Sequence, residues 1–475
     1  MAQVRHASMM LIREFVRQTP ADASVVIAGR SQFFDSEKEL EAALGVDESF
    51  VRLTLNDFTN AQIARFLMKG GYAGAVPTWI PARPLLLGYL AARGFLKDVV
   101  EVGDDHTPEE SWDLLLDLIS AREANINPAL DGEAVRGIIE QLASVARATT
   151  DGRGPLTFAD LEDAFVSACG HRPDDLGAVL LQRLPGLGLR DVTDDSRQFI
   201  DEQFVDAARA GDVARFLFDP FSTTLDAESW LIPIGDLGAA VTAAKARRVG
   251  LAPAQFQLAI QRAAEERGAG TLAADVLRVA LMCGVGFEGR NVYIREADIG
   301  LLELSYDMPD ISPVELQDCV VLRLEIDATT PNDRLPSFNG CLIAVLEGRV
   351  ESDMPFEKFT QCSVETASGT TETTAGIMEL ALPSGVRVAL TVLKKLYLQR
   401  GAGRKESAFS RGIDPASRRL VEPVLREVER EGLATHGKIG SETIYYPVRS
   451  SAARVHRILA SPSSDDSLLN ACRAL

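Results

Sequence analysis

Four segments of the sequence share one pattern: IREADI at 294–299, LQDCVV at 316–321, FNGCLI at 338–343 and FTQCSV at 359–364. Their fourth residues, Ala297, Cys319, Cys341 and Cys362, lie 22, 22 and 21 residues apart. Apolar residues recur three positions before and two positions after each of them, and Leu302, Leu324, Leu346 and Ala367 follow five positions after. A fixed period of about 20 residues with aligned apolar positions is typical of a solenoid. The sequence therefore predicts a short right-handed β-helix of about four coils within residues 291–385.

The aligned cysteines of this repeat are predicted to form a ladder of small core residues. Neighbouring strands lie about 4.8 Å apart, so each cysteine would stack on the next and face a dry interior. A metal site or a disulfide is the less favoured alternative. The sequence has no CxxC pair, and its five histidines are dispersed, so a zinc site is not expected.

The composition narrows the class of protein. The chain has 475 residues, a length that predicts three or four domains. Its net charge of −19 argues against a surface that binds nucleic acid or anionic membranes throughout. No apolar run approaches the roughly 18 residues that a membrane span requires, and the start of the chain does not look like a signal peptide. The six cysteines lie far apart. We therefore expect a cytoplasmic, reduced protein without a membrane segment.

Near the start of the chain, four apolar residues end at a glycine and an arginine. Ser24–Ala28 reads as a buried, parallel strand, and Gly29 allows the backbone to turn. Arg30 would project from the carboxyl end of that strand, where α/β sheets bind ligands. The alternative is an ordinary surface arginine.

The rest of the chain divides into helical and mixed segments. Helices followed by a short, turn-rich β piece predict a winged-helix domain at 106–216, and Ala-rich runs predict a helical connector at 217–290. Residues 386–460 carry 15 Lys and Arg against 7 Asp and Glu. A helix at 386–399, a helix at 415–431 capped by Asp414, and a hairpin at 435–447 predict a C-terminal winged helix. Residues 461–475 are predicted to be a frayed polar tail.

The sequence lacks the usual catalytic motifs. It contains no GxxxxGK[ST] loop, no strand ending in paired acids, and no GxSxG or HExxH motif. From its motifs alone, the chain has no self-sufficient active site.

The order of motifs in the first 216 residues resembles the second half of a NACHT-type (STAND) signalling NTPase. The resemblance rests on the strand ending at Arg30, then LTLNDFT at 53–59, ARPLLL at 82–87 and Phe-Ile-Asp at Phe199–Asp201. This class includes animal innate-immune receptors and bacterial anti-phage sensors. The resemblance implies that Arg30 is the sensor residue near the γ-phosphate and that Pro84 contacts the nucleotide base. At Phe199–Asp201 the family's phosphate-sensing histidine is absent, and Ala82 stands where Gly or Asn is usual.

The resemblance also implies that the family's Walker A and Walker B motifs would lie before the strand that ends at Arg30. The chain would thus be a truncation, a late start or one part of a two-part protein, with ATP and Mg²⁺ bound only when a missing or partner-supplied P-loop completes the site. ATP hydrolysis by this chain alone is not expected. The implied domains are a partial α/β NTPase core (1–57), a helical lid (58–105), a winged helix (106–216), a helical connector (217–290), a short β-helix (291–385), a C-terminal winged helix (386–460) and a tail (461–475).

The basic C-terminal segment has two interpretations. In the first, Arg411, Arg418, Arg419 and Arg426 follow a DNA backbone and the hairpin around Lys438 enters the minor groove. In the second, the segment docks a protein or is structural, because four glutamates are interleaved on the same helix and would repel phosphate.

Three hypotheses for function follow. The first is the regulatory and sensor portion of a NACHT-like signalling ATPase in prokaryotic anti-phage defence, with a protein partner or a missing NTPase half. The second is a stand-alone DNA-associated regulator that uses residues 386–460. The third is a non-functional gene remnant.

Overall fold

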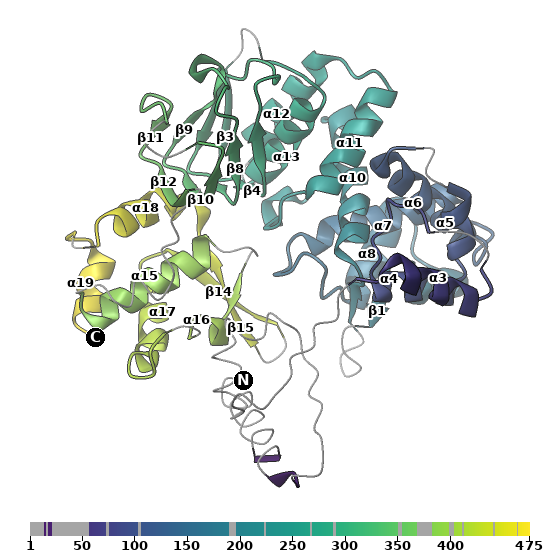
Figure 1. The fold of residues 1–475 in the computed structure, drawn as a ribbon, viewed down its shortest axis with the longest axis horizontal. Coiled ribbons are helices and arrows are strands. Elements are labelled where there is room, and N and C mark those ends of the chain that lie inside the picture. The colour runs from purple at the N-terminus through teal and green to yellow at the C-terminus, as the bar shows by residue number, and fades with distance from the viewer. Residues whose placement is uncertain are drawn as a thin grey trace.

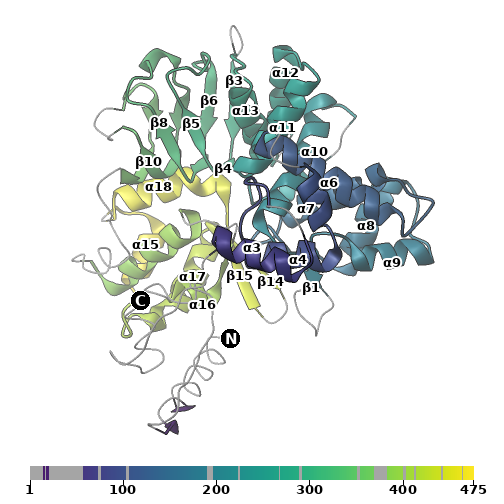
Figure 2. The ribbon, with the colours of Figure 1, turned by 45° about the vertical axis from the view of Figure 1, so that its right-hand side comes forward.

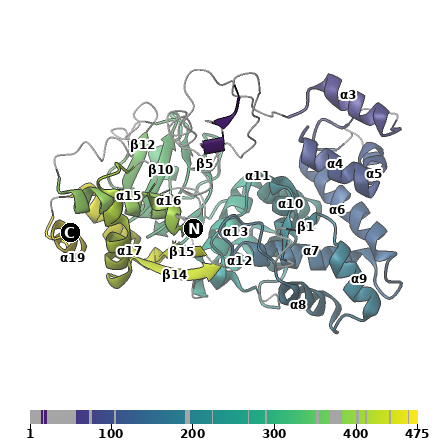
Figure 3. The ribbon, with the colours of Figure 1, turned by 90° about the horizontal axis from the view of Figure 1, so that it is seen from below.

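Three hydrophobic cores organise the residues that the computed structural model describes, and Figure 1 shows the matching parts. We call them the helical region (57–218), the solenoid body (225–367) and the C-terminal module (382–475). In Figure 3 the helical region and the C-terminal module lie at opposite ends. The structure describes residues 14–15, 18–20, 57–72, 76–102, 106–189, 196–222, 225–266, 268–287, 291–349, 354–367, 382–398, 403–410, 413–439, 442–462 and 464–475.

The helical region is built from amphipathic helices with well-formed caps. Thr59, Thr107 and Thr157 each accept the backbone N–H three residues on, and the side chain at that position reaches back to the cap. These reciprocal bonds fix where the helices begin. The helices are α3 (Asn60–Lys69), α4 (Pro84–Arg93), α5 (Leu96–Val102), α6 (Pro108–Ala124), α7 (Gly132–Ala146), α8 (Phe158–Cys169), α9 (Asp175–Arg183) and α10 (Glu202–Phe218).

A small antiparallel sheet lies between α9 and α10. β1 (Leu187–Leu189) pairs with β2 (Arg197–Phe199), and Arg197 also bridges to Leu156 in the connection between α7 and α8. The three extended segments are thus ordered Leu156, β2, β1. Along the chain the order is α7, the Leu156 segment, α8, α9, β1 and β2.

Helix α10 belongs to two cores at once. Its first half places Phe204 and Ala208 in the core of the helical region, and its second half places Val213 and Leu217 in the core of the solenoid body. Its 17 residues span about 25 Å. Three further helices, α11 (Asp236–Arg248), α12 (Pro253–Glu265) and α13 (Gly270–Met282), then lead to the solenoid, where α12 and α13 pack against the first coil.

The β-solenoid confirms the predicted repeat. In one parallel sheet Ile294 lies opposite Leu316, Leu316 opposite Phe338, and Phe338 opposite Phe359. The chain passes four times through this sheet and completes about three turns between residues 292 and 364. The first sheet contains β3 (Val292–Arg295), β6 (Val314–Gln317), β9 (Ser337–Asn339) and β11 (Phe359–Thr360). The second contains β4 (Asp298–Ile299), β5 (Leu302–Leu304), β7 (Val320–Val321), β8 (Leu324–Ile326), β10 (Leu342–Glu347) and β12 (Ser363–Ala367).

The aligned cysteines occupy the interior of the solenoid. Cys319 and Cys341 are fully buried, and the Cys341 thiol donates to the Leu316 carbonyl at 3.3 Å. The hydrogen bond with the neighbouring Cys319 thiol, together with burial, holds the pKa of Cys341 well above its usual value. A thiol with a raised pKa is unreactive. The six cysteines are free thiols, so the cysteines of the ladder act as core residues.

Each coil of the solenoid turns one corner through the left-handed backbone region. The corner residues are Glu296, Asp318, Gly340 and Gln361, with φ between 52° and 66°. Only Gly340 adopts this conformation without a steric penalty from Cβ.

Replacing Glu296 by glycine is therefore expected to raise the free energy of unfolding by about 0.5–1 kcal/mol, because it relieves the left-handed strain at an exposed corner. Glu315→Gly is the matched control. It makes the same change within strand β6 and is expected to cost about 0.5–1 kcal/mol. Urea unfolding midpoints measure both. Equal losses for the two variants would contradict the assignment of strain to the corner.

The C-terminal module combines helices with a three-stranded sheet in the order β13-β15-β14. The predicted hairpin is confirmed, with His436 opposite Tyr445. The Tyr397 hydroxyl donates to the Leu433 carbonyl at 2.7 Å and so ties the first helix to the sheet. The elements are α15 (Ser384–Tyr397), β13 (Arg404–Lys405), α16 (Glu406–Phe409), η5 (Arg418–Leu420), α17 (Val421–Arg430), β14 (Ala434–Ile439), β15 (Glu442–Pro447), α18 (Ala452–Ala460) and α19 (Ser467–Arg473).

Two details of the module differ from the sequence-based expectation. Asp414 does not cap a long helix. Its carboxylate accepts the N–H groups of Ala416 and Ser417 in a turn, and α17 begins only at Val421. The tail is not frayed either, because α19 buries Leu468 and Leu469 fully in the third core. The sequence did not predict this helix because Leu468 and Leu469 are a short apolar pair among polar residues.

The module docks on the solenoid through α18. Val320 and Leu342 of the second solenoid sheet belong to the same core as the module's helices. Figure 2 shows α18 lying along the lower edge of the solenoid, between its strands and α15. The expected strand at Ser24–Ala28 lies outside the described residues.

Candidate functional site

The structure brings together two of the segments on which the family resemblance rests. Pro84 opens α4 at its first turn, and Arg83, which precedes it, contacts the start of α10. Arg83 Nη1 donates to Asp201 Oδ2 at 2.9 Å. Asp201 also caps α10 by accepting the N–H groups of Gln203 and Phe204. The loop before α4 and the Phe199–Asp201 segment are therefore held side by side.

A second link fixes the same two segments. The Tyr89 hydroxyl on α4 accepts the N–H of Gly186, in the tight turn that leads into β1. Burial raises the pKa of Tyr89 to about 12, so its hydroxyl stays protonated. Gly186 has φ of 78°, and a Cβ there would lie 2.1 Å from the Phe204 ring. The turn therefore requires glycine at this position.

The described residues around Pro84 do not fit a phosphate group. Arg83 donates to Asp201 there, and the Asp201 carboxylate stands where a phosphate would need a cation. Arg30 lies outside the described residues. No nucleotide step is therefore assigned to this place.

The expected DNA-contacting residues lie on separate elements of the C-terminal module. Arg418 and Arg419 are exposed on η5, and Lys438 is exposed on β14. Arg426 pairs with Glu422 one turn away on α17. Arg411 lies outside the described residues. Of the expected DNA-contacting residues that the structure describes, Arg418, Arg419 and Lys438 thus remain exposed without an acidic partner in an ion pair.

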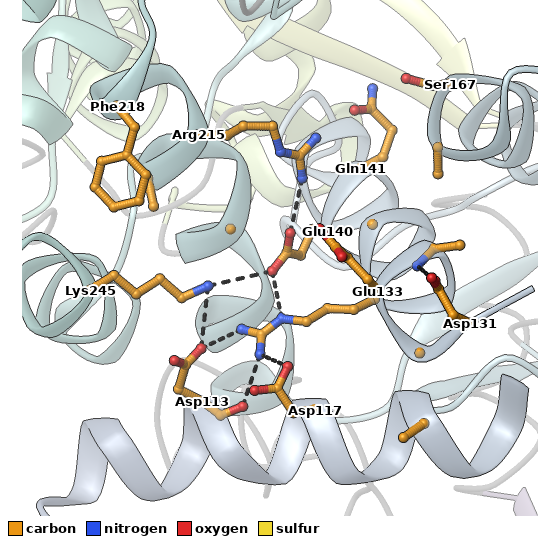
Figure 4. A pocket seen from close by; sticks show the side chains of 18 of the residues that line it. Asp113, Asp117, Asp131, Glu133, Glu140, Gln141, Ser167, Arg215, Phe218 and Lys245 are labelled. Carbon is orange, nitrogen blue, oxygen red and sulfur yellow. Dashed lines mark hydrogen bonds and ion pairs between the residues drawn. The ribbon is translucent and has the colours of Figure 1, made fainter. Parts of the chain in front are cut away.

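The sequence reasoning missed a cluster of charges between four helices, which we call the polar cluster. Most of its members line a cavity of about 970 Å³, and Figure 4 shows their ion pairs. It consists of Asp113 and Asp117 on α6, Arg136 and Glu140 on α7, Asp212 and Arg215 on α10, and Lys245 and Arg248 on α11.

Two buried carboxylates form the centre of the polar cluster. Asp113 contacts Arg136, Lys245 at 3.2 Å and Arg248 at 3.3 Å. Burial alone would raise the pKa of Asp113, but Lys245 and Arg136 hold it below its usual value. Glu140 likewise meets Arg136 at 2.8 Å, Arg215 at 2.9 Å and Lys245 at 3.7 Å. Each carboxylate is therefore held by three cations.

Close helix packing places Glu140 in this position. A Cβ at Gly211 would lie 1.7 Å from Glu140 Cδ, so α10 presents bare backbone to the carboxylate. The i,i+4 spacing of Asp113 with Asp117 and of Arg136 with Glu140 was visible in the sequence. The sequence does not show that these residues meet Arg215 and Lys245. Arg215 follows Glu140 by 75 positions, and Lys245 lies further still along the chain.

A second buried pair connects the helical region to the solenoid body. Arg147, at the end of α7, is fully buried and contacts Asp275 on α13. Its guanidinium lies 3.7 Å from the centre of the Trp230 ring and donates to the Ile232 carbonyl at 2.8 Å. Asp275 also accepts the N–H of Ile234. This arrangement is structural and has no access to solvent.

Comparisons with known proteins give no relative: no family model, no curated protein and no solved structure matches the chain. Within the described residues, no helix is long and apolar enough to cross a membrane. In the same part of the chain, no group of His, Cys, Asp and Glu is arranged to hold a metal ion.

Proposed function

We propose that the chain is the regulatory and sensor portion of a NACHT-like signalling ATPase that acts in prokaryotic anti-phage defence. The observation that carries the proposal is the Arg83–Asp201 contact. It joins the loop before Pro84 to the start of α10, and in the family these two segments close on a nucleotide from the lid and from the winged helix. The similarity to the family lies in the order and the positions of these segments, so the function is assigned by analogy.

The topology of two parts of the chain supports the proposal. We take α7 to β2, and α15 to β15, as winged helices, because each runs helix, extended segment, two helices, hairpin. In each, the first extended segment pairs with the last strand: Leu156 with β2, and β13 with β15. A protein with two such modules and a solenoid has large surfaces for recognition.

In this proposal, helix α10 connects a recognition surface on the solenoid body to the segments that would face the nucleotide. It begins at Asp201, beside Arg83, and ends inside the core of the solenoid body. A rigid helix shared by two cores transmits a displacement of one to the other. In this proposal, a ligand or partner that shifts the solenoid and the C-terminal module moves the start of α10.

Purified chain is expected to release no phosphate from Mg·ATP above the rate in buffer. One charge-assisted contact from Arg30 contributes about 1.5–3 kcal/mol, whereas micromolar binding needs about 8 kcal/mol. A radiolabelled-phosphate assay measures the rate. Turnover that disappears in Arg30→Ala would contradict the proposal, because the chain would then hold a complete site.

A second candidate function is DNA binding by the C-terminal module. The exposed Arg418, Arg419 and Lys438 favour it. The glutamates of α17 argue against DNA binding, because Glu422 pairs with Arg426 and Glu427 pairs with Arg430.

For this candidate, fluorescence anisotropy with a labelled duplex is expected to give an affinity that falls about 40-fold between about 50 and 200 mM salt, the change for three phosphate contacts. The Arg418→Ala/Arg419→Ala double variant should weaken binding at every sequence. Arg65→Ala/Lys69→Ala is the matched control, since it removes two exposed cations of α3. Equal weakening by both pairs would exclude a DNA surface on the module.

A further inference from the structure

The cavity beside the polar cluster has two chemically different ends. Arg136 of α7 contacts both Asp113 and Asp117 of α6, while Gly132 packs against Ala121 further along α6. The two helices therefore run antiparallel, and their register separates the charges along the cavity. One end carries Arg215, Lys245 and Arg248, Asp131 and Glu133 line the other, and Asp117 lies between them in contact with Arg136.

The basic end is open to a ligand. The side chains of Arg215 and Arg248 are 49% and 56% exposed, although both reach inward to the buried carboxylates. Arg248 meets Asp113 only at 3.3 Å, from each of its two terminal nitrogens. A guanidinium carries five donors in a fork that suits an oxyanion. Arg248 can therefore keep its partner and bind an anion as well.

The placement of charges at the basic end favours an anion. Asp113, Glu140 and Asp212 are buried, and Asp212 contacts Arg215 at 2.9 Å. The side chains of Arg215 and Arg248 reach the surface instead, so the solvent side of this end presents cations. At the opposite end the carboxylates are solvated, and Asp131 is engaged as the cap of α7. A second anionic group would be repelled at that end.

Apolar side chains adjoin the basic end. Phe218 lies one turn beyond Arg215 on α10 and is 37% exposed, and Val249 follows Arg248 and is 61% exposed. Figure 4 shows Phe218 and Arg215 on the same wall, near Lys245. A hydrophobic body attached to the anion would bury against these two side chains.

We propose that this cavity binds a phosphomonoester with an apolar body, with its phosphate on Arg215, Lys245 and Arg248 and its body against Phe218 and Val249. The acidic end limits the ligand to one phosphate. This site is distinct from the segments around Pro84, and it does not depend on the proposed signalling role.

Isothermal titration of the full chain with phenyl phosphate and with inorganic phosphate tests this site. Phenyl phosphate is expected to bind saturably and more tightly than phosphate. Arg248→Ala should weaken both probes about tenfold, the effect of one charge-assisted contact. Phe218→Ala should weaken only phenyl phosphate, and Asp117→Asn should tighten the binding of both probes, since it removes a nearby negative charge.

Arg65→Ala on α3 is the matched control, and circular dichroism checks that each variant is folded. Opposite effects of Arg248→Ala and Asp117→Asn would not arise from a structural ion-pair network alone. The proposal is overturned if neither probe saturates, if Arg248→Ala binds as the parent does, or if Arg65→Ala weakens binding as much as Arg248→Ala.

Discussion

Arg147→Met is expected to lower the free energy of unfolding by about 3–5 kcal/mol, the cost of breaking a buried ion pair on one side. The substitution leaves Asp275 buried with the N–H of Ile234 as its backbone partner, and it removes the cation from the face of Trp230. The pair connects α7 to α13, so the loss weakens the junction between the helical region and the solenoid body. Urea unfolding followed by tryptophan fluorescence measures it.

Two variants isolate the cause. Arg426→Met removes an exposed arginine with an i,i+4 partner and is expected to cost less than about 0.5 kcal/mol. The Arg147→Met/Asp275→Leu double variant replaces both charges by apolar groups and should recover most of the loss. A single Arg147→Met variant within about 1 kcal/mol of the parent would mean that the pair does not hold the two parts together.

Phe338→Ala is expected to cost about 3–5 kcal/mol, because it opens a cavity in the solenoid core. The Phe338 side chain is fully buried and stacks on Phe359 with ring centres 4.6 Å apart. Its strand β9 lies between β6 and β11, so the cavity affects two neighbouring coils. Urea unfolding gives the loss, and hydrogen exchange of β9 and β11 should locate it.

Phe356→Ala is the matched control for this prediction. Phe356 precedes β11 in the same coil but is 87% exposed, so its replacement should change stability by less than about 0.5 kcal/mol. Similar losses for the two phenylalanines would contradict the stacked-coil core.

The solenoid could be predicted from the sequence because its structure is periodic. Each coil repeats the same environment, so the residues that stack in space, such as Leu316 and Phe338, also align at a fixed sequence spacing. The left-handed corners could not be foreseen, because three of the four carry Glu, Asp or Gln and only Gly340 has the expected residue type. Packing of the strands on either side imposes the conformation there.

The polar cluster could not be predicted for the opposite reason. Asp113, Glu140, Arg215 and Lys245 meet only after four helices have packed, and no sequence spacing records that meeting. The Ala-rich run at 238–246 predicts only a helical connector. The structure buries α11 on most sides, where small residues allow helices to approach closely.

The identity of the proteins isolated together with the native chain tests the central claim most directly. An antibody raised against residues 386–475 would be used to isolate the protein from its source cells under native conditions, followed by mass spectrometry. The account predicts that the isolated material contains a protein with a GxxxxGK[ST] loop. Isolated material without any such protein would contradict it.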